Sequence, residues 1–447
     1  MTETADTTGL TGFFRDHDIH SLAADLRNGH TTSVELVEHS LAAIARLDPT
    51  LNAFTAVDAE GALDAARHAD AELARGHDRG VLHGIPVAVK DLVDVAGHVT
   101  TRGSVVHPGP ATADAECVRR LRTAGAVIVG RNVLHEFAFG ATGDRSAHGA
   151  SRNPWDPSRI SGGSSGGSAV ATAAGMVPLA VGTDTAGSVR VPAALCGVVG
   201  FKPAYGAIPA QGVWPLAASL DHVGVFARTA TGAAAAYTAM AGRSPDPVRA
   251  QRVAWLDPAC LGPCDPAIIA ALSETLRAAQ ITVDGTVGLP FAAGEVFEAL
   301  SVLQSSEAYT EYSAETEQRA SDIDPEVLGR LLRGRDTPAW QYVRACRQRD
   351  RLRAAADTLL TRFDVLAMPA APTVATEIDQ RAHQIDGHAV EVRSALLSLT
   401  CPWNLTGHPA LSVPAGVVSG LPVGLQLISA PGNEGMLFDL AARIEHR

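Results

Sequence analysis

Residues 161–190 constrain the fold and chemistry of this chain more than any other segment. Two stretches rich in glycine and serine, 161–168 and 182–188, are separated by small and apolar residues. Glycine permits backbone conformations that other residues avoid, and it lets a bound molecule approach main-chain N–H groups. A flexible linker would lack the apolar flanks at 169–175 and 176–181. The pattern therefore predicts an active-site floor made of two turns around a short helix.

The overall composition argues against several classes of protein. The chain has 447 residues, a formal net charge of −12 and no long basic run. We therefore expect no attraction to nucleic acid or to an anionic membrane, and we expect a small-molecule substrate instead. No stretch approaches the roughly eighteen uncharged apolar residues that a membrane span requires.

The cysteines and the N-terminus bear on the cellular compartment. The six cysteines are scattered, and the first residues are polar. This usage predicts no disulfide framework and no secretory signal, so we expect a cytoplasmic protein with a loose leader at residues 1–16. Cys260 and Cys264 have no further ligands nearby, so we expect no metal, and nothing in the sequence indicates a cofactor.

Helical and strand-like patterns alternate along the chain, which is typical of a wound α/β sheet. Helices are expected from residue 18, from the capping box of Thr32 and Glu35 to near residue 47, and over 58–75, 114–124, 294–313 and 338–362. Strands are expected over 84–91, 126–130, 363–369, 402–414 and 420–428. Because the C-terminal strands should complete one sheet with the N-terminal half, we predict a single domain.

The glycine-rich segment does not fit the common nucleotide or histidine-based motifs. Neither stretch ends in the Gly-Lys-Ser/Thr of a phosphate loop, and no G-x-G-x-x-G follows a strand. Ser188 is not in a G-x-S-x-G elbow. His135 has no partner in the pattern, so a structural histidine is a simpler interpretation than a general base.

A hydroxyl combined with a lysine remains as the reactive pair. The apolar run at 84–91 carries Lys90 at its end, where it should reach solvent, pair with an acid such as Asp91, or take part in catalysis. A buried, neutral lysine can accept a proton from serine, and N–H groups of a glycine-rich turn can stabilise an oxyanion. These features together indicate hydrolysis of an amide or an ester.

Several motifs resemble the amidase signature family. In the family's order they are 84–91, 153–155, 162–168, 182–190, 196–203, 219–221 and 404–414. The resemblance covers 18–230 and 360–445, whereas 231–360 matches only in being helical. It implies a single amidase domain over 1–447, an α/β fold with a mixed, twisted central sheet covered by helices on both faces. Residues 231–360 would be a variable, mostly helical insertion that forms part of the substrate pocket.

The resemblance also implies a Ser-cisSer-Lys triad and its supporting residues. Ser188 would be the nucleophile, Ser164 would follow a cis peptide bond and pass the proton, and Lys90 would be the base. The backbone N–H groups of the oxyanion hole would be those of Thr185, Ala186, Gly187 and Ser188. The supporting residues would be Ser165, Thr183, Asp184 and Arg190. Many members have glycine in place of Ala186, but a methyl group is tolerated there if φ is negative.

The substrate is less constrained than the triad. The resemblance assigns selectivity to loops near 136–150 and 211–215 and to 300–345. The candidate substrate contacts are Phe137, Ala138, Phe139, Gly140 and Trp214. Their aromatic members favour an apolar acyl or aryl group over a charged one, although core packing explains them equally well. The same machinery could cleave a small linear amide, a carbamate or an ester.

Two alternatives remain open. The chain could be the A subunit of a tRNA-dependent amidotransferase, which shares the core and passes ammonia to a partner, although the region after Ser219 does not obviously resemble that protein. It could also be a binding protein that has lost catalysis, although all triad positions are filled. For the stand-alone hydrolase we expect a monomer or a homodimer.

Overall fold

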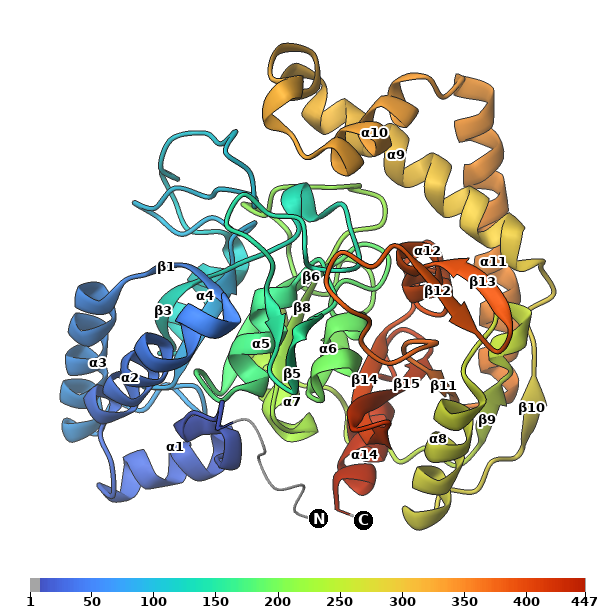
Figure 1. Cartoon of the computed structure of the whole chain (residues 1–447). Coiled ribbons are helices and arrows are strands. Elements are labelled where there is room, and N and C mark those ends of the chain that lie inside the picture. Colours follow the sequence, from blue (N-terminus) through green and yellow to red (C-terminus); the bar gives the residue numbers. More distant parts are fainter. Residues whose placement is uncertain (1–8, 447) are drawn as a thin grey trace.

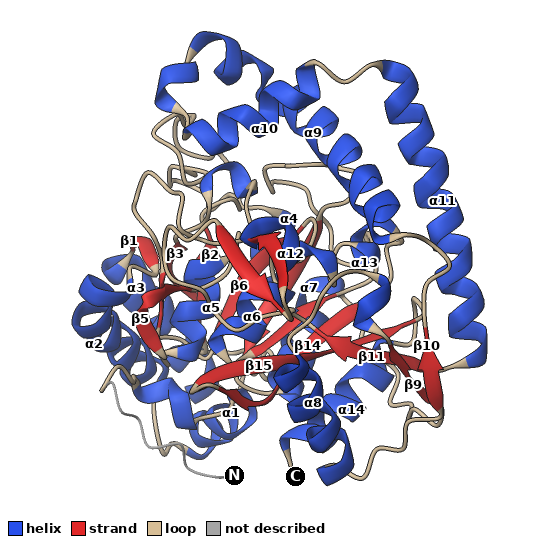
Figure 2. Ribbon diagram, turned by 45° about the vertical axis from the view of Figure 1, so that its right-hand side comes forward, coloured by secondary structure: helices blue, strands red, loops and turns tan. Residues whose placement is uncertain are grey.

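A large mixed β-sheet runs through the whole molecule and carries helices on both faces (Figures 1 and 2). The structure, a computed structural model, describes residues 9–446. The sheet has 11 strands, and its order interleaves strands from the two ends of the chain. The predicted single α/β domain is therefore confirmed, because neither half of the chain completes the sheet alone.

The strands pair in both directions. In spatial order they are β1 (Phe54–Val57), β3 (Val127–Asn132), β2 (Pro86–Lys90), β6 (Leu179–Asp184), β8 (His222–Ala227), β7 (Val199–Lys202), β14 (Ala410–Val418), β15 (Leu421–Ser429), β11 (Val365–Pro369), β9 (Val253–Leu256) and β10 (Gly285–Val287). Strand β2 is parallel to β3 and β6, and β9 is parallel to β10 and β11, whereas the remaining pairs are antiparallel. Two small two-stranded sheets join β4 (Arg152–Asn153) to β5 (Asp156–Ile160) and β12 (Ala382–Ile385) to β13 (His388–Glu391).

Helices connect most of these strands. They are α1 (Ile19–Asn28), α2 (Ser33–Leu51), α3 (Ala59–Ala74), α4 (Glu116–Thr123), α5 (Gly166–Ala173), α6 (Arg190–Cys196), α7 (Ala230–Ala241), α8 (Pro266–Ala278), α9 (Ala293–Gln318), α10 (Pro325–Arg335), α11 (Ala339–Arg362), α12 (Val392–Ser398), α13 (Pro402–Leu405) and α14 (Glu434–Glu445). Short 3-10 helices are η1 (Phe13–Asp16), η2 (Glu136–Ala138), η3 (Pro258–Cys260) and η4 (Ala320–Asp322).

Alternation along the strands separates two hydrophobic layers. In β2, Val87 and Val89 join a cluster that includes residues of α1, α4 and α7, whereas Ala88 joins a cluster that includes residues of α2, α5 and α6. Successive side chains of a strand point to opposite faces, so one short apolar strand supplies both layers. Lys90 is two residues beyond Ala88 and is also buried, which brings a basic side chain into the interior at the end of this strand.

The predicted N-terminal helices are largely confirmed. Asp18 caps α1, Gly29 ends it with φ of 69°, and Thr32 and Glu35 form the expected capping box. Helix α2 continues to Leu51 rather than ending near residue 47, with Pro49 in its last turn. The expected loose leader is wrong for Phe13–Asp16, which form η1 with Phe14 buried, and its residues 1–8 lie outside the described part.

Two further predictions need correction. The expected strand at 402–414 begins later, because Pro402–Leu405 form α13 and β14 starts at Ala410. The segment 231–360 is mostly helical, as expected, but it also supplies β9 and β10 at one edge of the sheet. These two strands have four and three residues, too few for a clear alternating pattern.

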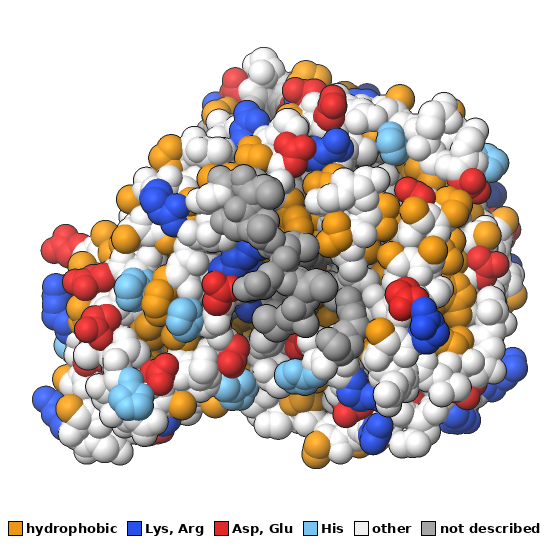
Figure 3. All heavy atoms as spheres, turned by 60° about the horizontal axis from the view of Figure 1, so that its bottom comes forward, with side chains coloured by type: hydrophobic (Ala, Val, Ile, Leu, Met, Phe, Trp, Pro, Cys, Tyr) orange, Lys and Arg blue, Asp and Glu red, His pale blue; other side chains and the backbone are white. Residues whose placement is uncertain are grey.

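The surface agrees with the mixed charge of the sequence. On the face in Figure 3, acidic and basic side chains are interspersed outside the grey segment. Among residues 9–446, no helix combines the length and apolar character that crossing a bilayer requires.

Candidate active site

Lys90 and Ser164 meet in the interior at the end of β2. Lys90 Nζ donates a hydrogen bond to Ser164 Oγ at 2.7 Å and another to Thr183 Oγ1 at 2.7 Å. Lys90 and Ser164 are fully buried, and Thr183 is 3% exposed. Because β2 and β6 are adjacent parallel strands, their carboxyl ends bring Lys90 and Thr183 together, while Ser164 comes from the turn before α5.

The Lys90 amine has hydroxyl partners and no close carboxylate. Burial lowers the pKa of Lys90 to about 7, and the more distant charges of Asp221 and Asp184 oppose this shift. Among the described residues, no carboxylate lies within ion-pair distance, 4.0 Å, of the amine. A substantial neutral fraction at physiological pH would let this lysine accept a proton.

The two glycine- and serine-rich turns are tied together through the backbone. The peptide bond between Gly163 and Ser164 is cis. The N–H of Ser165 donates to the carbonyl oxygen of Ser188 at 3.3 Å. The described residues include no direct hydrogen bond between the hydroxyl groups of Ser164 and Ser188. Ser188 is 5% exposed.

The turn before α6 has free N–H groups. Among residues 9–446, the backbone N–H groups of Thr185, Ala186 and Ser188 have no hydrogen-bond partner. The N–H of Gly187, which the resemblance predicts to join them, donates to Asp184 Oδ1 at 2.8 Å in this structure. Gly187 has φ of 139°, a conformation that favours glycine. Ala186 is not among the residues with positive φ, so its methyl group causes no backbone strain.

Asp184 and Arg190 hold this turn in place through a buried ion pair. The Asp184 carboxylate accepts hydrogen bonds from the guanidinium of Arg190 at 3.0 and 2.9 Å and from the N–H of Val189 at 3.1 Å. Both side chains are fully buried. Burial raises the pKa of Asp184, but the charge and hydrogen bonds of Arg190 outweigh it and hold that pKa below its usual range. The pair therefore stays ionised and fixes the turn.

The side-chain hydroxyls of Ser165 and Thr185 connect the two turns to neighbouring segments. Ser165 Oγ donates to the carbonyl oxygen of Thr183 at 3.0 Å, which joins the first turn to β6. Thr185 Oγ1 donates to Asp221 Oδ1 at 2.6 Å. Burial raises the pKa of Asp221 to about 7, against hydrogen bonds from Thr185, Leu216 and Ala217. Asp221 lies within a family motif, but sequence reasoning missed its contact with the turn.

Three polar residues from distant parts of the sequence also support the site. Asn404 Nδ2 donates to Asp184 Oδ1 at 2.9 Å, and Arg190 Nη1 donates to Gln426 Oε1 at 2.7 Å. Thr400 Oγ1 donates to the carbonyl oxygen of Ala186 at 2.6 Å. Asn404 and Gln426 are amide side chains in otherwise apolar runs, and this is the signal in the sequence that could have identified them.

Most of the predicted substrate contacts pack against one another. Phe137, Ala138 and Phe139 are buried, and the Phe137 ring stacks on Tyr312 of α9 at 4.4 Å between centroids. Arg102 lies over the rings of Phe137 and Trp214, and Gly140 touches the ring of His135. Of the two interpretations, core packing therefore describes Phe137 and Trp214 directly.

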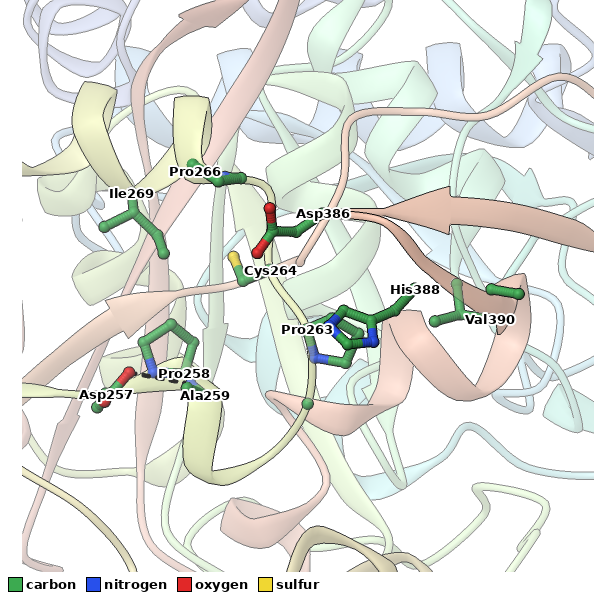
Figure 4. Close-up of a pocket in the computed structure, with 12 residues that line it drawn as sticks. Asp257, Pro258, Ala259, Pro263, Cys264, Pro266, Ile269, Asp386, His388 and Val390 are labelled. Atoms are coloured by element: carbon green, nitrogen blue, oxygen red, sulfur yellow. Dashed lines mark hydrogen bonds between the residues drawn. The ribbon is translucent and has the colours of Figure 1, made fainter.

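A separate surface pocket lies away from these residues. It has a volume of about 570 Å³ and is formed by the loop after β9, the start of α8 and the β12–β13 hairpin (Figure 4). Its lining includes Cys264, Asp386 and His388, and none of the predicted site residues. In the described part of the chain, no group of three or more His, Cys, Asp or Glu side chains is arranged to hold a metal ion.

The chain resembles amide-cleaving enzymes and amidotransferase components over most of its length. It is 36% identical over 440 residues to AtzE, a 1-carboxybiuret hydrolase subunit of Pseudomonas sp. (strain ADP), with 92% of this chain and 94% of that protein covered. It is 39% identical over 463 residues to the A subunit of the glutamyl-tRNA(Gln) amidotransferase of Anaeromyxobacter sp. (strain K), with 93% and 92% covered.

Solved structures of amidases are also similar to this chain over most of its length. A crystal structure of an amidase superposes with a TM-score of 0.92 at 35% identity, covering 96% of this chain and all of that one. Peptide amidase from Stenotrophomonas maltophilia superposes with a TM-score of 0.81 at 30% identity, and 97% of each chain is covered.

The family relationship also includes the segment that the sequence motifs leave out. A model of the Amidase family matches residues 35–285 and 288–438, so the similarity continues through the helices after residue 231. The match covers far more than half of the chain and agrees with the expected family. This protein belongs to the amidase signature family of hydrolases.

Proposed function

We propose that this protein hydrolyses the C–N bond of a small linear amide through an acyl-enzyme on Ser188. The observation that carries the proposal is the buried hydrogen bond between Lys90 Nζ and Ser164 Oγ, in a setting that lowers the pKa of the lysine to about 7. Such a pair can remove a proton from a nearby hydroxyl without a histidine.

In the proposed mechanism, neutral Lys90 takes the proton of Ser164 as Ser164 takes the proton of Ser188. Ser188 Oγ then forms a bond to the carbonyl carbon, and the C–N bond breaks as the proton passes to the leaving amine. Water attacks the resulting ester and releases the acid, which restores Ser188. The hydrogen bond from the Ser165 N–H to the Ser188 carbonyl oxygen holds the segments that carry Ser164 and Ser188 beside each other.

The proposed oxyanion hole consists of the backbone N–H groups of Thr185, Ala186 and Ser188. These N–H groups lack partners among the described residues, and Asp184 and Thr400 hold the turn that presents them. Preorganised donors of this kind stabilise the charge that develops on the carbonyl oxygen. Gly187 shapes the turn rather than donating to the substrate.

A substrate panel tests this function. Purified protein should be assayed with aliphatic amides, anilides, carbamates and esters, and Ser188→Ala should lower turnover by about 10⁴-fold or more. A fluorophosphonate probe should label the wild type and not Ser188→Ala, while circular dichroism remains the same for both. Retention of full activity in Ser188→Ala would remove the nucleophile assignment.

A second candidate is the A subunit of a tRNA-dependent amidotransferase. It is favoured by the 39% identity to the A subunit of a glutamyl-tRNA(Gln) amidotransferase. Glutaminase activity together with co-purifying partner proteins would support it. Hydrolysis of simple amides by the isolated chain would favour the stand-alone enzyme, which we propose to be a monomer or a homodimer.

We further propose that residues 231–360 form part of the substrate pocket, since Glu307 of α9 accepts a hydrogen bond from the N–H of Ser219 at 2.9 Å.

A further inference from the structure

Arg393 on α12 is a cation without a matching carboxylate. Its Nε is buried and has no hydrogen-bond partner among the described residues. Nη2 donates a long hydrogen bond of 3.4 Å to the neutral Gln304 of α9. No carboxylate in the described part of the chain lies within 4.0 Å of this guanidinium. Arg393 is nevertheless half-buried as a residue, so it does not belong to the fully buried core.

The surroundings of Arg393 add to its positive charge. Burial and the charge of neighbouring Arg330 lower the pKa of Arg393 to about 9. The nearby carboxylates are engaged elsewhere. Glu326 pairs with Arg145, Arg330 and Arg381, and Glu391 accepts hydrogen bonds from the N–H and hydroxyl of Ser394.

A buried polar side chain without a partner belongs to the same region. His135 is fully buried, and neither ring nitrogen has a hydrogen-bond partner among residues 9–446. Its ring lies against Gly140, where an added Cβ would clash with Nε2. Phe139, the residue before Gly140, lies under Arg393 with 5.9 Å from ring centroid to guanidinium carbon. Buried polar groups of this kind normally have a hydrogen-bond partner, which makes this ring a candidate to contact a bound polar molecule.

This region is continuous with the proposed active site. The N–H of His135 donates to the carbonyl oxygen of Ser164 at 3.0 Å, and the N–H of Gly163 donates to the carbonyl oxygen of Ala141 at 2.7 Å. On the other side, Arg393 precedes Thr400, which binds the Ala186 carbonyl, by seven residues. Helix α12 ends at Ser398, so Arg393 and Thr400 belong to this helix and to the turn that follows it. In both ribbon views α12 lies below the α9–α10 pair (Figures 1 and 2).

We infer that Arg393 binds a carboxylate of the substrate, so that the preferred substrates are amides with a carboxylate at the far end, such as monoamides of dicarboxylic acids. The inference rests on the proposed hydrolase function and names its substrate class. A guanidinium binds a planar carboxylate through two parallel hydrogen bonds, and Arg330 adds positive charge beside it. Phe137 and Trp214, two of the aromatic residues behind the expected apolar preference, pack on Arg102.

Kinetics with matched substrates test this subsite. Monoamides of succinic, glutaric and adipic acid should be compared with their methyl esters, which have the same length and no charge. In the wild type, kcat/KM for amide cleavage should be at least about tenfold higher for the carboxylate form of the best chain length. Arg393→Gln should reduce this ratio by about tenfold or more, and Arg393→Lys should keep part of it.

The exposed Arg333 provides the matched control, because Arg333→Gln removes one positive charge from the neighbouring helix α10. This variant should keep the wild-type ratio. If Arg393→Gln lowered both forms equally, Arg393 would be a structural residue and the inference would be overturned, as it would be if the wild type preferred the methyl esters.

Direct binding separates this inference from the proposed function. Titration calorimetry with glutarate should show binding to the wild type and at least about tenfold weaker binding to Arg393→Gln. If glutarate bound in this Arg393-dependent way but no amide were cleaved, the carboxylate site would stand and the hydrolase function would fail. If amides were cleaved but glutarate bound equally to both proteins, the carboxylate site would fail alone.

Discussion

Two fully buried cations, Lys90 and Arg190, lie close to the same turn but have opposite environments. Arg190 is paired with Asp184 and also binds Asn404, Gln426 and the Thr400 carbonyl. Lys90 has two hydroxyl partners and no ion pair among the described residues. Every nitrogen of the Arg190 guanidinium has a hydrogen-bond partner, whereas the Lys90 amine contacts hydroxyl groups, which can exchange protons.

The two environments suit different roles: that of Arg190 fixes the shape of the turn, and that of Lys90 favours proton transfer. A buried charge that is paired and hydrogen-bonded stays charged and fixes its neighbours. A buried lysine without a counter-ion is easily deprotonated, and this agrees with its pKa of about 7. Exchanging the environments would remove function in both cases, since a paired Lys90 could not accept a proton and an unpaired Arg190 could not hold the turn.

The largest effect is expected from removing the unpaired cation. Lys90→Met should lower kcat/KM for an amide by about 10³-fold, because a positioned general base contributes about 10² to 10⁴. The chain offers a matched control in Lys202, a second buried lysine whose Nζ donates to the carbonyl oxygen of His408 at 2.6 Å. Lys202→Met should keep far more activity per folded molecule. Equal losses in the two variants would contradict the role of Lys90.

Lys90→Met should be less active than the wild type but more stable to heat. The pKa of Lys90 is about 7 in the folded protein and near its ordinary value of 10.5 when unfolded. The unfolded chain therefore binds more protons between these values, and the stability of the wild type rises with pH across this window. Lys90→Met should thus gain most in melting temperature below pH 7, and the gain should shrink toward pH 10.5. A gain that increased with pH would contradict the buried, uncompensated amine.

Much of the candidate site could be predicted from the sequence, because its main elements do not depend on contacts between distant residues. The two glycine- and serine-rich turns, the helix between them and the strand ending in Lys90 are each contained in a short segment. The pairing of Lys90 with Ser164 came from the family resemblance, since no local pattern joins residues 74 positions apart. The structure supplies that contact.

Other parts could not be predicted, because they depend on contacts between distant segments or on the direction of a single N–H group. Asn404 and Gln426 reach Arg190 from more than 200 residues away. The N–H of Gly187 donates to the buried Asp184 carboxylate, and no local pattern predicts that direction. Arg393 has no sequence signal, because its distinguishing property is that Nε lacks a hydrogen-bond partner among the described residues.

A smaller loss of activity and a clear loss of stability are expected from breaking the paired cation. Arg190→Met leaves the Asp184 carboxylate buried without its partner, which should lower the free energy of unfolding by about 3–5 kcal/mol. Activity should fall about 10- to 100-fold as the oxyanion donors lose their anchor. Urea denaturation and kcat/KM measure the two effects. Unchanged stability would show that Arg190 does not support the turn.

A still smaller effect is expected from changing one partner of Lys90. Thr183→Val removes the hydroxyl that accepts a hydrogen bond from Lys90 Nζ but keeps the shape of the side chain. The loss of one such bond should lower kcat about tenfold through poorer positioning of the amine. Thr172→Val is a matched control, because the Thr172 hydroxyl is also buried and, within residues 9–446, bonds only to the Ser168 carbonyl oxygen of α5. Similar kinetics in both variants would show that Thr183 has no positioning role.

The smallest effect should be a shift in pH dependence caused by Asp221. In the wild type, kcat/KM should rise with pH through about 7 as Lys90 loses its proton, and the Asp221 charge raises the pKa of Lys90. Asp221→Asn removes that charge, so the midpoint should move to lower pH by less than about one unit, as expected for a partner that is not in contact. Asp336→Asn, at the exposed end of α10, should leave the midpoint unchanged. A midpoint that stayed fixed or moved upward in Asp221→Asn would mean that a group other than Lys90 controls the pH profile.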